Sequence, residues 1–298
     1  MSCAKCSEPA PRRIHRLVVI GVGLIGGSFA LDLRRHRQVD EIIGVGRSRA
    51  NLDVALNRGV IDRIAEDVAS VVAEADCILL ALPVAAMARV LATIAPALPT
   101  HCLVTDVGST KQDVIAAART TLGDKIGQFI PAHPIAGAET SGAEAAREHL
   151  FDGKALILTP LPENRPEDVT TLTALWQTCG ARVTAMAADV HDRVFAAVSH
   201  LPHLAAFALV DDLIGRPEAE LCFGYAGAGF RDFTRIAASS PEMWRDIALA
   251  NREALLIELD AYLAKLTEVR ALIEHRDGDA LHTLFIRASA ARRKWQGG

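Results

Sequence analysis

The chain contains no uninterrupted apolar run that approaches the ~18–20 residues needed to cross a bilayer. Its first residues, Met1 to Arg13, also lack the apolar stretch of a secretory signal peptide. The net charge is -4, and no basic stripe interleaved with aromatic residues is present, which argues against a nucleic-acid-binding protein. These absences predict a cytoplasmic protein without membrane or nucleic-acid partners. The 50% hydrophobic content predicts a globular chain with a large core.

Cysteine shows no pattern of paired ligands beyond one N-terminal pair. Of the six cysteines, four are scattered through apolar segments and are expected to be core residues of a reduced protein. Cys3 and Cys6 have metal-ligand spacing, but no second cysteine pair or histidine pair follows nearby. We therefore predict no metal site and expect residues 1–14 to form a disordered tail.

A glycine-rich turn follows the first apolar run, residues 17–20, and opens a helical stretch from Ser28 to His36. Its GxGxxG pattern allows a tight turn, a close approach of backbone to pyrophosphate, and close packing of helix on strand. The helix start also offers N–H groups and a positive dipole end to an anion. The pattern predicts dinucleotide binding, and an ordinary glycine-rich turn is the alternative. The predicted cofactor contacts here and after the third apolar run are Gly21, Gly23, Leu24, Ile25, Gly26, Leu82 and Pro83.

The second predicted strand ends without the acidic residue that NAD-specific sites place about 20 residues beyond the fingerprint. Gly46, Arg47, Ser48 and Arg49 stand there instead. A carboxylate would accept a hydrogen bond from the ribose 2′-hydroxyl and repel a 2′-phosphate, whereas arginines attract the phosphate. We expect NADP as the cofactor, with NAD as the alternative. The competing interpretation is that Ser48 caps the next helix and both arginines are solvated.

Short apolar runs alternate with helical stretches from Arg16 to about Ala185, and then only helical periodicity remains. Such alternation predicts a parallel sheet covered on both faces. The expected strands are 17–20, 41–45, 77–82, 102–106, 128–131, 155–159 and 182–185. The expected helices include 85–95, 110–121, 166–179, 190–214, 241–273 and 279–294.

The fold class that follows is α/β, with a Rossmann-type doubly wound parallel sheet followed by an all-helical domain. We place the dinucleotide-binding domain at residues 15–187 and the helical substrate and dimerisation domain at residues 188–298. The helical segment 241–273 is long for one domain, so we expect it to pack against a partner chain.

Polar residues follow two later strands of the predicted sheet. Ser109 lies at a strand end and a helix start, where N-capping is its alternative role. His133 follows the next strand between prolines and is a candidate proton acceptor. In the helical half, the segments 199–203 and 227–235 are candidate loops, and an arginine close to glycines suits binding of a substrate carboxylate.

Taken in order, these segments resemble the prephenate/arogenate dehydrogenases of tyrosine biosynthesis, or cyclohexadienyl dehydrogenases. The matching motifs are GVGLIGGS, DVGSTK, HPIAGAETSG, SHLPH, GFRDFTR and PEMWRDI, and the resemblance covers residues 16–251. Any one motif is weak, but the ordered set is highly specific. Ala228 and Arg231 depart from several family members, which have glycine and lysine there, so the pocket wall is expected to differ.

The resemblance implies an oxidative decarboxylation. The nicotinamide takes hydride from the ring carbon that bears the 4-hydroxyl, the ring carboxylate leaves as CO2, and the ring aromatises. Prephenate would give 4-hydroxyphenylpyruvate, and arogenate would give tyrosine. The catalytic residues implied are His133, which takes the hydroxyl proton, and Ser109, which hydrogen-bonds the same hydroxyl. The substrate-pocket residues implied are Arg235, His203, Trp244, Glu139 and Asp192.

The family also implies a homodimer formed by the helical domains. A strict arogenate dehydrogenase is the alternative within the class, and a catalytically silent NADPH-binding regulator is the alternative outside it. His203 favours prephenate, because a cationic or hydrogen-bonding histidine suits a carboxylate-rich substrate. His133, Ser109 and Arg235 together argue against the silent regulator. The chain length leaves no room for a fused chorismate mutase or regulatory domain, so inhibition by tyrosine would act at the catalytic pocket.

Overall fold

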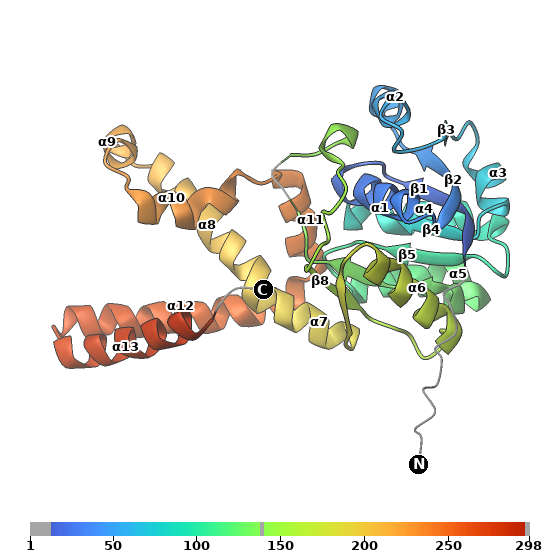
Figure 1. Ribbon diagram of the computed structural model, residues 1–298. Helices are drawn as coiled ribbons and strands as arrows, with labels where there is room; N and C mark the ends of the chain where they lie inside the picture. The colour runs from blue at the N-terminus through green and yellow to red at the C-terminus, as the bar shows by residue number, and fades with distance from the viewer. Residues whose placement is uncertain (1–12, 138–139, 296–298) are drawn as a thin grey trace, which may run out of the picture. The chain divides into compact units, whose positions relative to one another are not determined.

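The computed structural model describes residues 13–137 and 140–295, and the chain divides into two compact units, residues 1–191 and 192–298 (Figure 1). Cys3, Cys6 and Glu139 lie outside the described residues, as does most of the predicted tail. Ile14 was expected in that tail, but it begins the first strand and is fully buried. Cys222 was expected in the core, but it is only partly buried, unlike the other three described cysteines.

Six parallel strands form the main sheet of the first unit. They are β1 (Ile14–Ile20), β2 (Val39–Val45), β3 (Arg63–Ile64), β4 (Cys77–Leu80), β5 (Leu103–Asp106) and β6 (Phe129–Ile130). Their order is β3-β2-β1-β4-β5-β6, which places β1 at the centre. Leu17 and Val19 face one core cluster, while Val18 and Ile20 are equally buried on the opposite face. Because both faces are covered, β1 ends in a continuous apolar run, residues 17–20.

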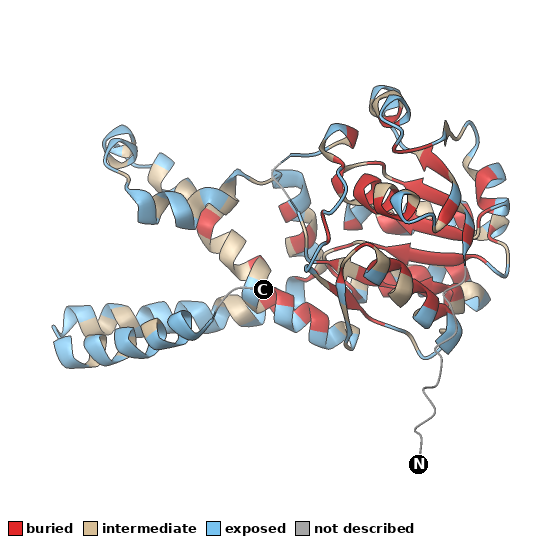
Figure 2. Ribbon diagram, viewed as in Figure 1, coloured by how far each residue is buried: buried red, intermediate tan, exposed pale blue. Residues whose placement is uncertain are grey.

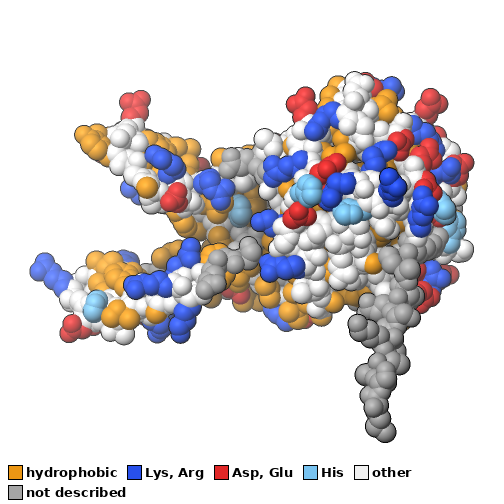
Figure 3. Space-filling model, in the orientation of Figure 1, with side chains coloured by type: hydrophobic (Ala, Val, Ile, Leu, Met, Phe, Trp, Pro, Cys, Tyr) orange, Lys and Arg blue, Asp and Glu red, His pale blue; other side chains and the backbone are white. Residues whose placement is uncertain are grey.

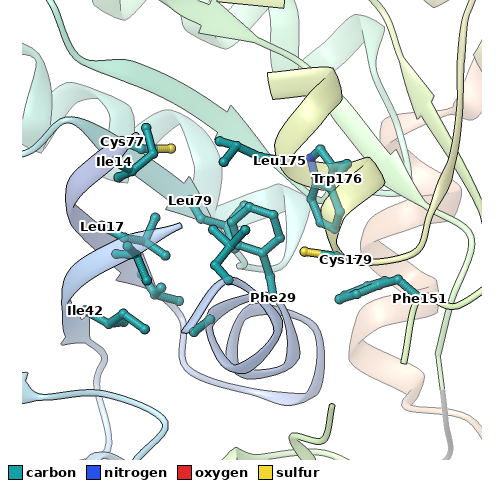
Figure 4. Close-up of a cluster of buried hydrophobic side chains, with 14 of the residues drawn as sticks. Ile14, Leu17, Phe29, Ile42, Cys77, Leu79, Phe151, Leu175, Trp176 and Cys179 are labelled. Atoms are coloured by element: carbon teal, nitrogen blue, oxygen red, sulfur yellow. The ribbon is translucent and has the colours of Figure 1, made fainter. Parts of the chain in front are cut away.

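Helices cover this sheet. They are α1 (Leu24–Arg35), α2 (Arg49–Asn57), α3 (Val68–Ala73), α4 (Met87–Ile94), α5 (Gln112–Leu122) and α6 (Pro166–Thr178). Helices α1 and α6 contact each other, and α3, α4 and α5 form a second contacting group. Phe29 of α1 packs on Trp176 of α6 with ring centroids 4.4 Å apart, and Phe151 meets the same indole edge-on (Figure 4). The predicted doubly wound Rossmann-type sheet is confirmed.

A separate three-stranded sheet completes the first unit, so the prediction of one parallel sheet through residue 185 is wrong. Its strands are β7 (Ala132–Pro134), β8 (Ala155–Leu158) and β9 (Arg182–Ala185). Strand β7 runs antiparallel to β8, whereas β8 and β9 are parallel. The main sheet stops before Pro131, which has no N–H to continue a ladder. His133 therefore lies inside β7, opposite Ile157, and not beyond a strand end.

The described part of the second unit is helical, as predicted. Its elements are the end of α7 (Ala188–Phe195), a π-helical turn (Ala196–His200), α8 (Leu201–Ile214), α9 (Ala219–Gly224), α10 (Ala228–Thr234), a 3₁₀ turn (Arg235–Ala238), α11 (Pro241–Ala250), α12 (Arg252–Glu274) and α13 (Gly278–Lys294).

Three expectations for this unit are corrected. The segment 199–203 is not a loop, because the π-helical turn leads directly into α8 and Pro202 lies in its first turn, where a missing N–H is tolerated. The segment 227–235 contains helix α10. The long stretch 241–273 is two helices, separated at Asn251, whose side chain bonds the Asp192 carbonyl and His200.

The helical unit leaves much apolar surface exposed. Figure 2 shows α12 and α13 mostly in the exposed colour, and Figure 3 shows hydrophobic side chains along them and along α9 and α10. Exposed large apolar residues of this unit include Leu221, Tyr225, Leu249, Ile257, Leu263, Ile273, Phe285 and Ile286. Among the described residues, one helical stretch, Ala188–Ile214, is long and apolar enough to cross a membrane by length and composition alone. Exposed apolar surface on this scale is typical of a face that another molecule covers.

Candidate active site

The glycine-rich turn joins β1 to α1. Gly21 has a φ of 101°, and a Cβ there would lie 2.1 Å from the Ala81 carbonyl oxygen, so only glycine fits. A Cβ at Gly26 would lie 2.5 Å from the Gly21 oxygen. At Gly23, by contrast, a Cβ would meet no atom of the described residues within 4 Å. The packing of the described chain therefore requires Gly21 and Gly26 but not Gly23, the residue expected to lie against a pyrophosphate.

Helix α1 starts immediately after Gly23, which is its N-cap and makes no side-chain cap hydrogen bond. The first turn, which includes Leu24 and Ile25, carries no acidic residue, so its N–H groups and the dipole suit an anion. Leu82 follows β4 and lies 3.1 Å from the position of a Gly21 Cβ, so this loop borders the turn. Pro83 comes next and is exposed. The residues present fit a dinucleotide at this edge of the sheet.

The loop after β2 carries the residues proposed to select the cofactor. The Ser48 hydroxyl accepts a hydrogen bond from the Asn51 N–H at 3.2 Å, so the capping interpretation holds. Arg49 donates to Asp53 at 2.9 Å on the exposed face of α2, whereas Arg47 is simply exposed. Of the two arginines, Arg47 is the better candidate for a 2′-phosphate, because Arg49 already has a carboxylate partner.

Asn51 is a structural residue that motif analysis missed. Its amide nitrogen donates to the Val22 carbonyl at 2.7 Å, and its amide oxygen accepts from the Ala143 N–H at 2.8 Å. The side chain therefore ties α2 to the glycine-rich turn and to the segment that follows His133 in sequence. No local pattern identifies it, because its partners lie 29 and 92 residues away.

A buried ion pair joins the end of β5 to β7. Asp106 and Lys111 are both fully buried, and the Lys111 ammonium donates to Asp106 Oδ2 and, at 2.6 Å, to the Ala132 carbonyl. Asp106 Oδ1 accepts from the Ala132 N–H at 3.1 Å, and Oδ2 accepts from the Gly108 N–H at 2.7 Å. Both backbone groups of Ala132, the neighbour of His133, are thus held by this pair. The same clamp holds the DVGSTK segment that contains Ser109.

Ser109 lies between Asp106 and Lys111 in the sequence and is partly exposed. The alternative role of N-cap does not apply to it, because α5 begins at Gln112 with Lys111 at the N-cap position and no side-chain cap. Its hydroxyl is therefore not used to begin the helix.

His133 is partly exposed in β7, and its Nδ1 lies 2.8 Å from Nε2 of His191. The two rings meet edge-to-face at 63°, with centroids 5.1 Å apart. His191 lies in α7 and is fully buried. This partner was not among the predicted site residues, and a separation of 58 residues gives no local signal for it.

In the helical unit, His203 stacks on Trp244 with ring centroids 3.6 Å apart and planes inclined by 21°. His203 Nδ1 lies 2.8 Å from the Ser199 carbonyl oxygen, which can only accept, so Nδ1 carries the proton. The ring of His200 lies edge-on to the same indole, with its centroid 6.1 Å from that of Trp244. The indole nitrogen of Trp244 is buried and has no hydrogen-bond partner among the described residues. Such a donor is available to a bound ligand or water.

Burial lowers the pKa of His203, and the nearby positive charge of Arg235 lowers it further, while the hydrogen bond to Ser199 opposes both effects. This shift favours the neutral ring over the cationic form, the first of the two forms considered from the sequence. Arg235 begins the 3₁₀ turn after α10 and is exposed. His203 therefore lies close to both Trp244 and Arg235 within this unit. Asp192 is buried, and its carbonyl accepts a hydrogen bond from Asn251.

Comparisons with known proteins cover nearly the whole chain. The nucleotide-binding domain of prephenate dehydrogenase matches residues 29–185, and the dimerization domain of prephenate dehydrogenase matches residues 187–287. The chain is 36% identical over 278 residues to a cyclohexadienyl dehydrogenase of Zymomonas mobilis, which covers 93% of this chain and 94% of the relative.

Two solved structures are also similar. One is prephenate dehydrogenase from Aquifex aeolicus in complex with hydroxyphenyl propionate and NAD+, with a TM-score of 0.89, 34% identity and coverage of 95% of this chain and 99% of the other. The second is arogenate dehydrogenase from Synechocystis, with a TM-score of 0.80, 31% identity and coverage of 94% and 99%. The matched domains, the sequence identity and the shared fold agree, and this chain belongs to the prephenate dehydrogenase family.

Proposed function

We propose that this chain catalyses the oxidative decarboxylation of prephenate with hydride transfer to a nicotinamide dinucleotide, giving 4-hydroxyphenylpyruvate. The observation that carries the proposal is the setting of His133. Its ring is partly exposed, its Nδ1 is engaged by His191, and both backbone groups of its neighbour Ala132 are clamped by Asp106 and Lys111. A histidine fixed in this way suits a general base more than a surface or core role.

In the proposed mechanism, His133 removes the proton of the ring 4-hydroxyl through Nε2, and Ser109 hydrogen-bonds the same oxygen. The nicotinamide, when bound, supplies the hydride acceptor. As the hydroxyl becomes a carbonyl, the bond between the ring and its carboxylate breaks and CO2 leaves. The electron pair of that bond completes the aromatic ring and leaves the oxygen as a phenolate, which takes a proton back from His133. The chain's own contribution is therefore to hold the hydroxyl, receive its proton and return a proton to the phenolate.

For the substrate side chain we propose Arg235 as the carboxylate-binding residue. His203 and Trp244 would line the pocket, and Glu139 and Asp192 would orient the substrate. The Trp244 indole N–H is a donor suited to a carboxylate or carbonyl oxygen. Arogenate is a second candidate substrate, because His203 uses Nδ1 as a donor and, when neutral, offers Nε2 only as an acceptor. An acceptor suits an ammonium group, whereas a carboxylate there requires protonation of the ring.

We propose NADP as the preferred cofactor, on the strength of Gly46 in place of an acid and the exposed Arg47 beside it. NAD is the alternative, and NAD+ is the cofactor named with the Aquifex aeolicus relative.

We further propose a homodimer in the cytoplasm, with residues 15–187 as the dinucleotide-binding domain and 188–298 as the dimerisation domain. The matched dimerization domain and the exposed apolar side chains of α12 and α13 support pairing of chains. The apolar stretch Ala188–Ile214 falls wholly within that matched domain, so we assign its exposed face to a partner subunit rather than to a bilayer.

The test is a steady-state assay of the purified chain with prephenate and arogenate, each with NAD and NADP, following the reduced cofactor and identifying the product. His133→Asn should lower kcat by about 10²–10⁴-fold, the usual contribution of a general base. His101→Asn, at an exposed histidine of the same unit that pairs with Asp76, is the matched control and should change little. Absence of turnover with all four combinations, or a His133→Asn variant with normal kcat, would refute the proposed function.

A further inference from the structure

The hydrogen bond between His133 and His191 has one proton for two ring nitrogens. Nδ1 of His133 and Nε2 of His191 are 2.8 Å apart, so one of them donates and the other accepts. The direction of this bond decides the tautomer of His133. If His133 donates through Nδ1–H, its Nε2 carries a lone pair. If His191 donates instead, a neutral His133 must carry its proton on Nε2.

Only the first arrangement lets His133 act as a base through Nε2. After the proton from the substrate hydroxyl arrives at Nε2, the ring keeps its Nδ1–H and continues to donate to His191. The acceptor lone pair of His191 then faces a cationic donor, which strengthens the bond as positive charge develops on His133. The reverse arrangement leaves no lone pair on either nitrogen of His133 that a substrate proton could use.

We propose that His191 is a positioning residue for His133: it accepts the Nδ1–H hydrogen bond, fixes the ring orientation, and keeps Nε2 unprotonated. The proposal rests on the proposed role of His133 as general base. The backbone around His133 is already held by the β7–β8 ladder and by the clamp on Ala132, so ring rotation is the freedom that His191 removes. Full burial of His191 and the helical backbone of α7 give it a fixed position.

The test compares His191→Gln with His191→Leu. The glutamine amide reaches about as far as histidine Nε2 and can accept the same hydrogen bond, whereas leucine fills the space without an acceptor. We expect His191→Leu to lower kcat at saturating substrate about 10–100-fold, part of the contribution of base catalysis, with little change in either KM. His191→Gln should recover most of that loss. Equal kcat values for the two variants, or a loss confined to KM, would overturn the proposal.

Gln128→Leu is the matched control for damage to a buried polar site. Gln128 is buried in the same unit and donates to the carbonyls of Pro99 and Cys102. These two residues precede β5 and so lie at its amino end, whereas Asp106 lies at its carboxyl end. This variant should lose stability without losing kcat. A matching fall in its kcat would show that loss of stability alone explains His191→Leu.

A spectroscopic measurement tests the same bond without activity. The ¹⁵N shifts of a ring-labelled sample should show His133 protonated at Nδ1 and not at Nε2 in the parent, with this preference lost in His191→Leu. The opposite tautomer in the parent would overturn the inference even in an active enzyme.

If His133→Asn abolishes turnover and His191→Leu does not lower kcat, the inference about His191 alone fails. If His133→Asn leaves turnover intact, the proposed function fails instead.

Discussion

Removing the buried ammonium of Lys111 should strongly lower the free energy of unfolding of the first unit. In Lys111→Met, the side chain keeps much of its volume, but Asp106 loses its ion-pair partner in a fully buried site. Two backbone N–H donors, from Gly108 and Ala132, remain on the carboxylate. Removing one partner of a buried pair typically destabilises by about 3–5 kcal/mol.

The expected decrease in the free energy of unfolding is therefore about 3–5 kcal/mol. The double variant Asp106→Asn with Lys111→Met should recover part of it, because replacing both members of a buried pair is often nearly neutral.

The assay is urea denaturation followed by circular dichroism, with Lys265→Met as the matched control. Lys265 pairs with Glu268 on the surface of α12, where each side chain is 50% exposed. An exposed pair of this kind contributes at most about 1 kcal/mol. A loss below ~1 kcal/mol for Lys111→Met, equal to the control, would refute the view that this pair clamps β5 to β7.

Three further variants test the site. Arg47→Ala should raise the KM for NADP about tenfold or more and leave the KM for NAD unchanged, because a charge-assisted hydrogen bond contributes about 1.5–3 kcal/mol. Arg49→Ala should raise the KM for NADP less. Equal effects of Arg47→Ala on both cofactors would argue against a 2′-phosphate contact. Arg235→Gln should weaken substrate binding by about 2–5 kcal/mol with cofactor affinity unchanged, and a collapse of kcat at unchanged KM would place Arg235 in the chemical step instead. An NMR titration should give His203 a pKa below the ordinary histidine value, and the pKa should rise in Arg235→Gln. A lowered pKa in the folded parent means that the unfolded chain binds the proton more tightly. The His203 contribution to stability is therefore complete above the unfolded-state pKa and declines as the pH falls through it. A measured pKa of His203 above the ordinary value would contradict this pH dependence.

Most of the architecture was predictable because its causes are local. The turn at Gly21, the apolar runs of β1 and β4, and the proline start of α6 each depend on neighbouring residues and on the periods of strand and helix. The errors came where two local signals competed. Pro202 interrupts a helical pattern in the candidate loop 199–203, yet the first turn of a helix tolerates proline. The glycines at 227 and 229 likewise favour a loop where α10 forms.

The ordered motifs by themselves determined the family, the dinucleotide fold and the candidate residues Ser109, His133 and Arg235, because each motif is a short stretch whose chemistry is written in adjacent positions. Only the tertiary structure brought His191 to His133 across 58 residues and closed the Lys111 ammonium on the carbonyl of Ala132 across 21. The antiparallel turn of β7 onto β8, likewise, depends on which strands lie side by side and not on the pattern of either one. Hydrogen bonds between distant residues depend on topology. The pattern of apolar and polar residues along one chain therefore does not show which buried donor will bond to which acceptor.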